Sequence, residues 1–177
     1  MKIAVVYASK TGFSKKYANW IKKALNADIY THNKVTKSLL KPYDIIIYGG
    51  GLYASGIYGF KNFIRKYYAN QALFVYATGA SPGRESVLKD IFDNNFKSME
   101  LDQFKFYYLR GGFNYKDLNF KDKILMRLLK SKLKHKKNSK KPLTGDEKGM
   151  LKAYDTPVDL TKEKFINPLV EDVKNVV

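Results

Sequence analysis

Five short apolar runs alternate with stretches of helical periodicity, and this alternation restricts the fold more than any other feature of the chain. The runs are Ile3–Ala8, Asp28–Tyr30, Ile45–Tyr48, Ala72–Ala77 and Phe104–Leu109. Most of them are rich in β-branched or aromatic residues, as is typical of strands buried on both faces of a sheet. Strands that alternate with helices form a parallel sheet with right-handed crossover connections. The sequence therefore predicts a doubly wound α/β fold.

Three of the loops that follow these strands are unusually rich in glycine and hydroxyl residues. They span 9–14, 49–59 and 78–83, and they follow the first, third and fourth strands. In open parallel sheets, ligands bind outside the carboxyl ends of the strands at the point where the strand order reverses. With the strand order 2-1-3-4-5, these three strand ends are neighbours. The first loop could then hold a phosphate, while the other two bracket a flat ring.

The first loop has the composition of an anion site. Ser9-Lys10-Thr11-Gly12-Phe13-Ser14 lies between a strand and a helix, where the first N–H groups of the helix lack partners. Glycine allows close backbone approach, and three hydroxyls can donate to phosphate oxygens. The alternative is that Thr11 or Ser14 merely caps the helix. The glycine–lysine pair of the mononucleotide-binding P-loop is absent.

The second loop also contains a pattern used in dinucleotide binding. Gly49, Gly51 and Ala54 match G-x-G-x-x-A after a strand. The pattern follows the third strand rather than the first, Gly56 and Gly59 interrupt the start of a helix, and no suitable ribose-binding acid follows about twenty residues later. Glycines that simply turn the chain are the more economical interpretation of this stretch.

The loop after the first strand resembles the FMN phosphate loop of flavodoxins, with Ser9 and Ser14 where that family usually has Thr. The resemblance implies a flavodoxin-like five-stranded sheet of order 2-1-3-4-5 that binds FMN non-covalently. It also implies Tyr53 as the first candidate to stack on the flavin and Tyr58 as the second, the alternative being that either packs on a helix. The predicted FMN-binding residues are Ser9, Lys10, Thr11, Gly12, Phe13, Ser14, Gly51, Leu52, Tyr53, Ala54, Thr78, Gly79, Ala80, Ser81 and Gly83.

A narrower resemblance is to the flavodoxin-like protoporphyrinogen oxidases of bacteria. It rests on Gly111, Tyr115, Phe120 and Asp122, which precede the amphipathic stretch Ile124–Leu129. That subfamily tends to carry Arg in the aromatic-rich turn, and 113–119 contains none. The resemblance implies either an electron carrier between redox partner proteins or an oxidase that passes electrons to a quinone. We identify no catalytic side chain and no metal site, because the flavin would do the chemistry.

Composition adds constraints on the environment of the protein. The 177 residues suit a single domain spanning 1–177, and the absence of cysteine excludes disulfides and thiolate sites. No apolar run reaches membrane-spanning length and no signal-peptide pattern is present, so we expect a cytoplasmic protein. Lys and Arg number 33 against 16 Asp and Glu, a net charge of +17 that calls for an anionic partner. No nucleic-acid-binding motif accompanies this charge.

Residues 113–150 depart from the alternating pattern and are predicted to form a basic insertion after the fifth strand. Within 120–141, Phe120, Ile124 and Leu128, and Leu125, Leu129 and Leu133, recur at helical spacing beside a flank of Lys and Arg. Such a helix binds anionic membrane surfaces or acidic proteins, which would place the protein at the inner face of the membrane. The alternative is that the stripe packs on the domain. A last helix is predicted over 161–176, capped by Asp159 or Thr161 and restarting near Pro168.

Overall fold

The computed structural model describes residues 1–53, 55–69, 71–97, 99, 104–118, 120–139 and 142–176, without the side chains of residues 121 and 146. Its main sheet has five parallel strands in the order β2-β1-β3-β5-β6, which confirms the predicted order. The strands are β1 Ile3–Ala8, β2 Asp28–Thr31, β3 Ile45–Tyr53, β5 Ala72–Gly79 and β6 Phe104–Arg110. A short strand β4, Gly56–Ile57, pairs antiparallel with the end of β3.

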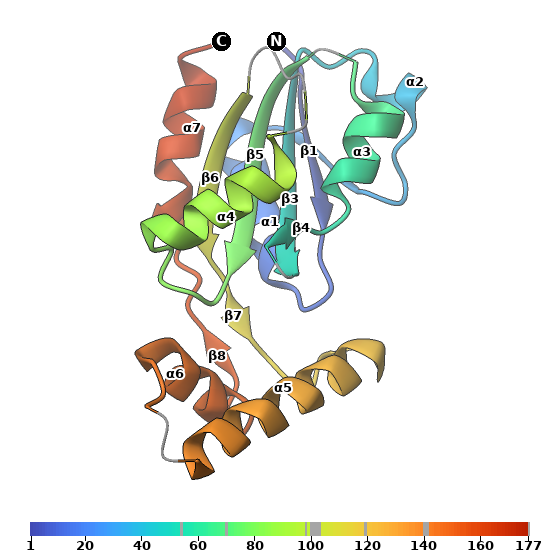
Figure 1. The fold of residues 1–177 in the computed structure, drawn as a ribbon. Coiled ribbons are helices and arrows are strands. Elements are labelled where there is room, and N and C mark those ends of the chain that lie inside the picture. Colours follow the sequence, from blue (N-terminus) through green and yellow to red (C-terminus); the bar gives the residue numbers. More distant parts are fainter. Residues whose placement is uncertain are drawn as a thin grey trace.

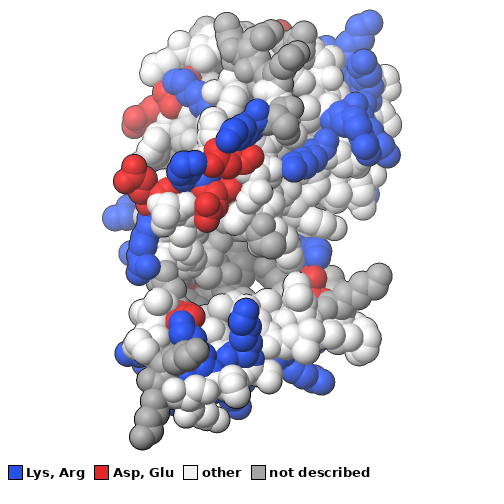
Figure 2. Space-filling view, viewed as in Figure 1, with Lys and Arg blue, Asp and Glu red and all other residues white. Residues whose placement is uncertain are grey.

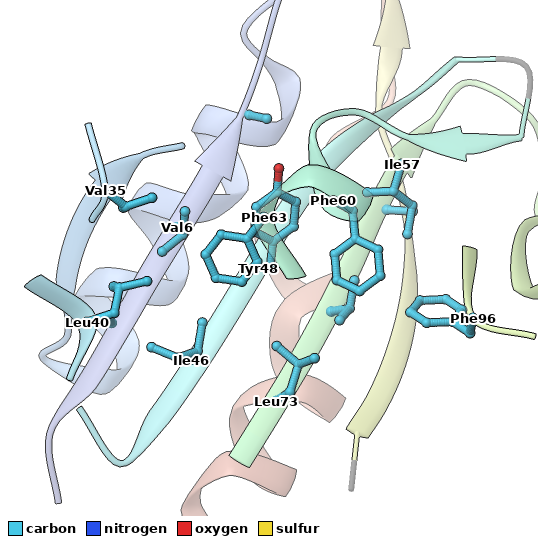
Figure 3. Close-up of a cluster of buried hydrophobic side chains, with 14 of the residues drawn as sticks. Val6, Val35, Leu40, Ile46, Tyr48, Ile57, Phe60, Phe63, Leu73 and Phe96 are labelled. Atoms are coloured by element: carbon cyan, nitrogen blue, oxygen red, sulfur yellow. The ribbon is translucent and has the colours of Figure 1, made fainter. Parts of the chain in front are cut away.

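Helices cover both faces of this sheet (Figure 1). They are α1 Phe13–Leu25, α2 Lys37–Leu40, α3 Phe60–Tyr67, α4 Glu85–Asn95, a 3-10 helix Glu163–Ile166 and α7 Asn167–Lys174. Alternate residues of β1 enter opposite cores: Ala4 and Val6 face one core, and Val5 faces the other. Figure 3 shows the first of these cores, where Tyr48, Phe60 and Phe63 pack together. The second core includes Tyr17 and Ile21 of α1.

Residues 112–159 form a separate unit at the carboxyl ends of the strands (Figure 1). Two short antiparallel strands enclose it, β7 Gly112–Phe113 and β8 Val158–Asp159. Between them lie α5 Phe120–Asn138 and α6 Gly145–Ala153. The unit is therefore longer than the predicted insertion of 113–150, because β8 has to return the chain beside β7. The helix α6, which starts at a Thr144–Glu147 capping box, was not predicted.

The third strand is longer than predicted, because the glycines expected to begin a loop continue it. The cause lies on the neighbouring strand: a Cβ at Gly49 would come within 1.8 Å of the Tyr76 ring. Glycine here leaves room for that ring, so the run stays extended and pairs with both neighbours. The glycines thus serve close packing within the sheet rather than a turn of the chain.

The C-terminal segment restarts at Pro168 as predicted, because the 3-10 helix ends and α7 begins at Asn167. The predicted helix cap is wrong. The Asp159 carboxylate accepts hydrogen bonds from the amide and hydroxyl of Thr161, which stabilises a turn before the 3-10 helix. Among the described helices, none is long and apolar enough to cross a membrane.

Candidate functional site

The loop between β1 and α1 leaves the start of α1 uncapped by any side chain. Gly12 occupies the N-cap with φ of 88°, and its amide donates to the Ser9 hydroxyl over 3.1 Å. The Ser14 hydroxyl is bonded to that of Thr78 at 2.6 Å. The capping alternative for Thr11 and Ser14 is therefore wrong. The first amides of α1 remain available to an anion, which the helix dipole also favours.

A buried tyrosine fixes the position of this loop against the sheet. The Tyr76 hydroxyl on β5 donates to the Ser14 carbonyl over 2.9 Å. Burial raises the pKa of Tyr76 well above its ordinary value, so the phenol stays a donor. Its ring occupies the space that Gly49 leaves open. The glycine of one strand and the tyrosine of the next thus hold the start of α1 at the sheet edge.

A cleft of about 720 Å³ opens at this edge, between the ends of β1, β3 and β5 and the unit 112–159. Gly12 is not among its lining residues and Gly83 does not reach it, while Ala54 lies outside the described residues. The predicted residues that do line it are Ser9, Lys10, Thr11, Phe13, Ser14, Gly51, Leu52, Tyr53, Thr78, Gly79, Ala80 and Ser81. The fold thus brings three separate loops to one cavity, and their role in binding FMN stays a prediction.

Tyr53 forms part of one wall of the cleft. The Lys10 ammonium lies 4.1 Å from the centre of its ring, and the Tyr58 ring lies 5.6 Å away. Burial, followed by the nearby Asp122 carboxylate and Tyr58, raises the pKa of Tyr53 to about 12. Tyr58 itself does not line the cleft and instead packs between Tyr53 and His32. Of the two candidate stacking residues, the structure brings Tyr53 alone to the cavity.

The loop after β5 supplies polar groups to the opposite side. The Tyr108 hydroxyl donates to the Ser81 carbonyl over 2.8 Å, and a Cβ at Gly79 would come within 2.7 Å of that hydroxyl. The Ser81 hydroxyl is buried and has no hydrogen-bond partner within the described protein. Buried hydroxyls are nearly always bonded, so this one is available to a water molecule or a ligand in the cleft.

The far wall of the cleft comes from α5 and was not predicted as part of the site. Leu125, Met126, Leu128 and Leu129 face the cavity, with Lys132 further along the helix. The other unpredicted lining residues are Tyr108, Gly111, Gly112, Phe113, Asn114, Leu118, Asp122 and Met150. The apolar stripe of 120–133 was the available signal, but its partner surface was not evident. Figure 2 shows the hollow between the two parts.

The cleft can bind an anion at one end and a flat apolar group along its length. Uncapped amides and the hydroxyls of Ser9, Thr11 and Ser14 suit a phosphate. Tyr53 and the leucines of α5 suit a ring system. Among the described residues, no three His, Asp or Glu side chains converge to hold a metal. These features agree with a phosphorylated, ring-containing cofactor such as FMN.

Known proteins that are similar to this chain include one sequence relative and two solved structures. The chain is 31% identical over 103 residues to an uncharacterized protein of Methanocaldococcus jannaschii, covering 55% of this chain and 67% of that protein. It is similar to the crystal structure of a WrbA-like flavodoxin from Agrobacterium tumefaciens, with a TM-score of 0.46, 17% identity, and 59% and 74% of the two chains covered. An oxidised flavodoxin 2 from Bacillus cereus gives a TM-score of 0.40, 17% identity, and 60% and 84% coverage.

The sequence profile of a family described as a flavodoxin domain matches residues 4–140, which is more than half of the chain. The match spans β1, the 9–14 loop and the whole parallel sheet, and it extends through α5. The cofactor to which this family points is FMN. The chain therefore belongs to the flavodoxin family.

Proposed function

We propose that the protein binds FMN in the cleft and transfers electrons between FMN and a redox partner protein. The observation that carries this proposal is the uncapped start of α1, which opens into the same cavity as Tyr53 and the unpaired Ser81 hydroxyl. A phosphate at the helix start would satisfy the free amides. The ring would then lie between Tyr53 and the 78–81 loop. FMN supplies the redox chemistry when bound, and the chain binds and orients it.

Each group in the cleft has a distinct role in this proposal. The 9–14 loop holds the phosphate through its amides and through the Thr11 hydroxyl. The buried Ser81 hydroxyl forms a hydrogen bond with a polar edge of the ring and so gains the partner that it lacks within the described protein. Tyr53 presents an aromatic face, while α5 excludes water from the other side. The positive charge of Lys10 near Tyr53 favours an anionic ring.

Titration of apoprotein with FMN and, separately, with riboflavin tests this function. We expect saturable changes in flavin absorbance and fluorescence with FMN at micromolar protein. Riboflavin should bind at least about 10-fold more weakly, because it cannot make charge-assisted hydrogen bonds to the loop. Reduced, FMN-loaded protein should then pass electrons to a redox protein. The absence of saturable FMN binding would disprove the proposal.

A second function is favoured by the apolar far wall of the cleft. Leu125, Leu128 and Leu129 would face the ring and offer a surface for a flat apolar molecule. We propose, as the alternative, oxidation of a substrate such as protoporphyrinogen, with the electrons passed to a quinone at a membrane surface. An oxidase would form porphyrin from protoporphyrinogen when a quinone is added. A carrier would not, although both would bind FMN.

A further inference from the structure

The apolar stripe of α5 is exposed along the first half of the helix and covered along the second. Leu133 is buried and Leu129 is half-buried against the rest of the 112–159 unit and the cleft. Phe120, Ile124 and Leu128 remain 78%, 46% and 65% exposed. Leu125 is also 62% exposed, so packing covers the second half of the stripe and leaves the first half uncovered. Neighbouring exposed apolar side chains on one helix are a signal of a binding surface.

The Lys and Arg side chains of α5 include some that form ion pairs within the 112–159 unit and others that are exposed. Lys130 pairs with Asp155 at 3.1 Å and lies over the Tyr154 ring, while Lys136 pairs with Glu147 at 2.7 Å. Lys130 thus holds α5 to the turn after α6, and Lys136 holds it to the first turn of α6. Arg127, Lys134 and Lys137 are exposed. Among the described residues none of these three has a carboxylate partner. Figure 2 shows Lys and Arg side chains spread over this unit between uncharged areas.

Arg127 and Lys134 share one side of the helix with Phe120 and Ile124, whereas Lys137 lies one turn beyond Leu133. Arg127 follows Ile124 by three residues and precedes Lys134 by seven, which keeps all three on neighbouring lines along α5. The apolar side chains occupy the first half of the helix and the free charges mostly the second. A helix with exposed Phe and Leu beside Lys and Arg matches the boundary between acyl chains and anionic headgroups.

We propose that this face of α5, formed by Phe120, Ile124, Leu128, Arg127 and Lys134 and extended by Lys137 in the last turn, binds an anionic lipid surface. A second copy of the chain does not fit, because each copy carries a net charge of +17 and would bring like charges together. Leu128 and Leu125 also line the cleft and remain exposed, so the apolar surface runs from the outer face into the cavity. Lipid contact would therefore open the mouth of the cleft toward the membrane.

This inference goes beyond electron transfer and does not depend on FMN. The test is sedimentation of the whole protein with vesicles of phosphatidylcholine, alone or mixed with phosphatidylglycerol. Binding should rise with phosphatidylglycerol and fall with added salt. The triple variant Arg127→Glu, Lys134→Glu and Lys137→Glu should lose at least about 100-fold in partitioning, since each basic residue contributes a factor of about five. The double variant Phe120→Gln and Ile124→Gln should lose about 10-fold in partitioning to the same vesicles.

Matched controls distinguish vesicle binding through this face of α5 from an effect of the overall charge. Lys22→Glu, Lys23→Glu and Lys66→Glu change the net charge equally, in the last turns of α1 and α3 at the opposite end of the sheet. This control should lose far less binding than the α5 variant. Phe120 and Ile124 do not line the cleft, so FMN titration and circular dichroism should match the wild type. A chain that binds vesicles but not FMN would retain this inference while disproving the proposed function.

Three results would overturn the inference. These are equal partitioning to neutral and anionic vesicles, no partitioning to either, and equal losses in the α5 and control triple variants. Any of them would leave an acidic protein as the partner of the α5 charges.

Discussion

The Lys10 ammonium and the Asp122 carboxylate form an ion pair of 2.8 Å between residues 112 positions apart. Lys10 belongs to the 9–14 loop and Asp122 to the first turn of α5. Both side chains are largely buried, with 23% and 15% exposure. The pair joins the two walls of the cleft, and the Lys10 ammonium also lies over the Tyr53 ring. It therefore links the position of α5 to the part of the site proposed to hold the flavin.

Loss of this ion pair should loosen α5. Asp122→Asn removes the charge with little change in shape. We expect a local cost of about 1–2 kcal/mol, between the values for exposed and for fully buried pairs. Amide hydrogens of α5 should then exchange about 5- to 30-fold faster, while those of β1 remain unchanged. Asp93→Asn, which breaks the exposed pair with Lys89 on α4, is the control. Unchanged exchange in α5 would mean that its other contacts suffice.

The same two residues should shift the reduction potential of bound FMN in opposite directions. A unit charge about 10 Å away is worth roughly 1–2 kcal/mol at an effective dielectric near 20, or some tens of millivolts after screening. Lys10→Gln should make the reduction potential for the formation of fully reduced flavin more negative. Asp122→Asn should make that potential less negative. Spectroelectrochemistry measures both shifts. Equal shifts of the same sign would contradict a Coulombic effect of the pair.

The net charge of the chain also predicts the reduction potential of FMN bound to the wild-type protein. Flavodoxins are commonly acidic, whereas this chain has a net charge of +17, which favours the anionic reduced flavin. The couple that forms fully reduced flavin should therefore be less negative than in acidic flavodoxins. A potential equal to theirs or more negative would show that local contacts outweigh the overall field.

We expect the Thr11 hydroxyl to bind the phosphate of FMN and to have no other structural role. Thr11→Val keeps the shape of the side chain and removes the hydroxyl, which would cost about 10-fold or more in FMN affinity. Riboflavin affinity should not change, because riboflavin carries no phosphate. We choose Thr11 over Ser14 because loss of the Ser14 hydroxyl would also leave that of Thr78 unpaired. Thr156→Val, at an exposed position, should affect neither ligand. An equal loss for both flavins would exclude a phosphate contact.

Alkaline pH should destabilise the fold through its buried tyrosines. Burial raises the pKa of Tyr48, Tyr76 and Tyr107, and that of Tyr53 to about 12. A raised pKa in the folded state favours the neutral phenol. Its stabilisation is thus complete below the unfolded pKa of about 10 and is lost as pH rises toward 12. The denaturant concentration at the midpoint of unfolding should therefore decrease as the pH rises above about 10.

Nuclear magnetic resonance of the Tyr53 ring provides the residue-specific measurement. Its signals, assigned by comparison with Tyr53→Phe, should titrate near pH 12 rather than near 10 if the fold survives to that pH. An ordinary titration near pH 10 in the folded protein would show that the ring is more solvated than its contacts with Lys10 and Tyr58 indicate.

The elements that depend on local pattern followed from the sequence. The apolar run Ile3–Ala8 gave β1 because its residues are buried on both faces of the sheet, and Pro168 restarted the last helix because it lacks an amide hydrogen. The alternation of strands and helices was sufficient for a parallel sheet, and the resemblance to flavodoxins supplied its strand order. Three loops at neighbouring strand ends were then sufficient to locate the cleft. These are short-range signals combined with a general rule of parallel sheets.

What the tertiary structure decided depends on contacts between distant segments. Gly49 stays in β3 because the Tyr76 ring of the adjacent strand needs its space, a constraint absent from the local sequence. Ser14 bonds Thr78 instead of capping α1, because β5 brings a hydroxyl within reach. The apolar stripe of α5 was visible in the sequence. Which of its residues line the cleft and which stay exposed was decided when β7 and β8 paired and set the helix against the sheet edge.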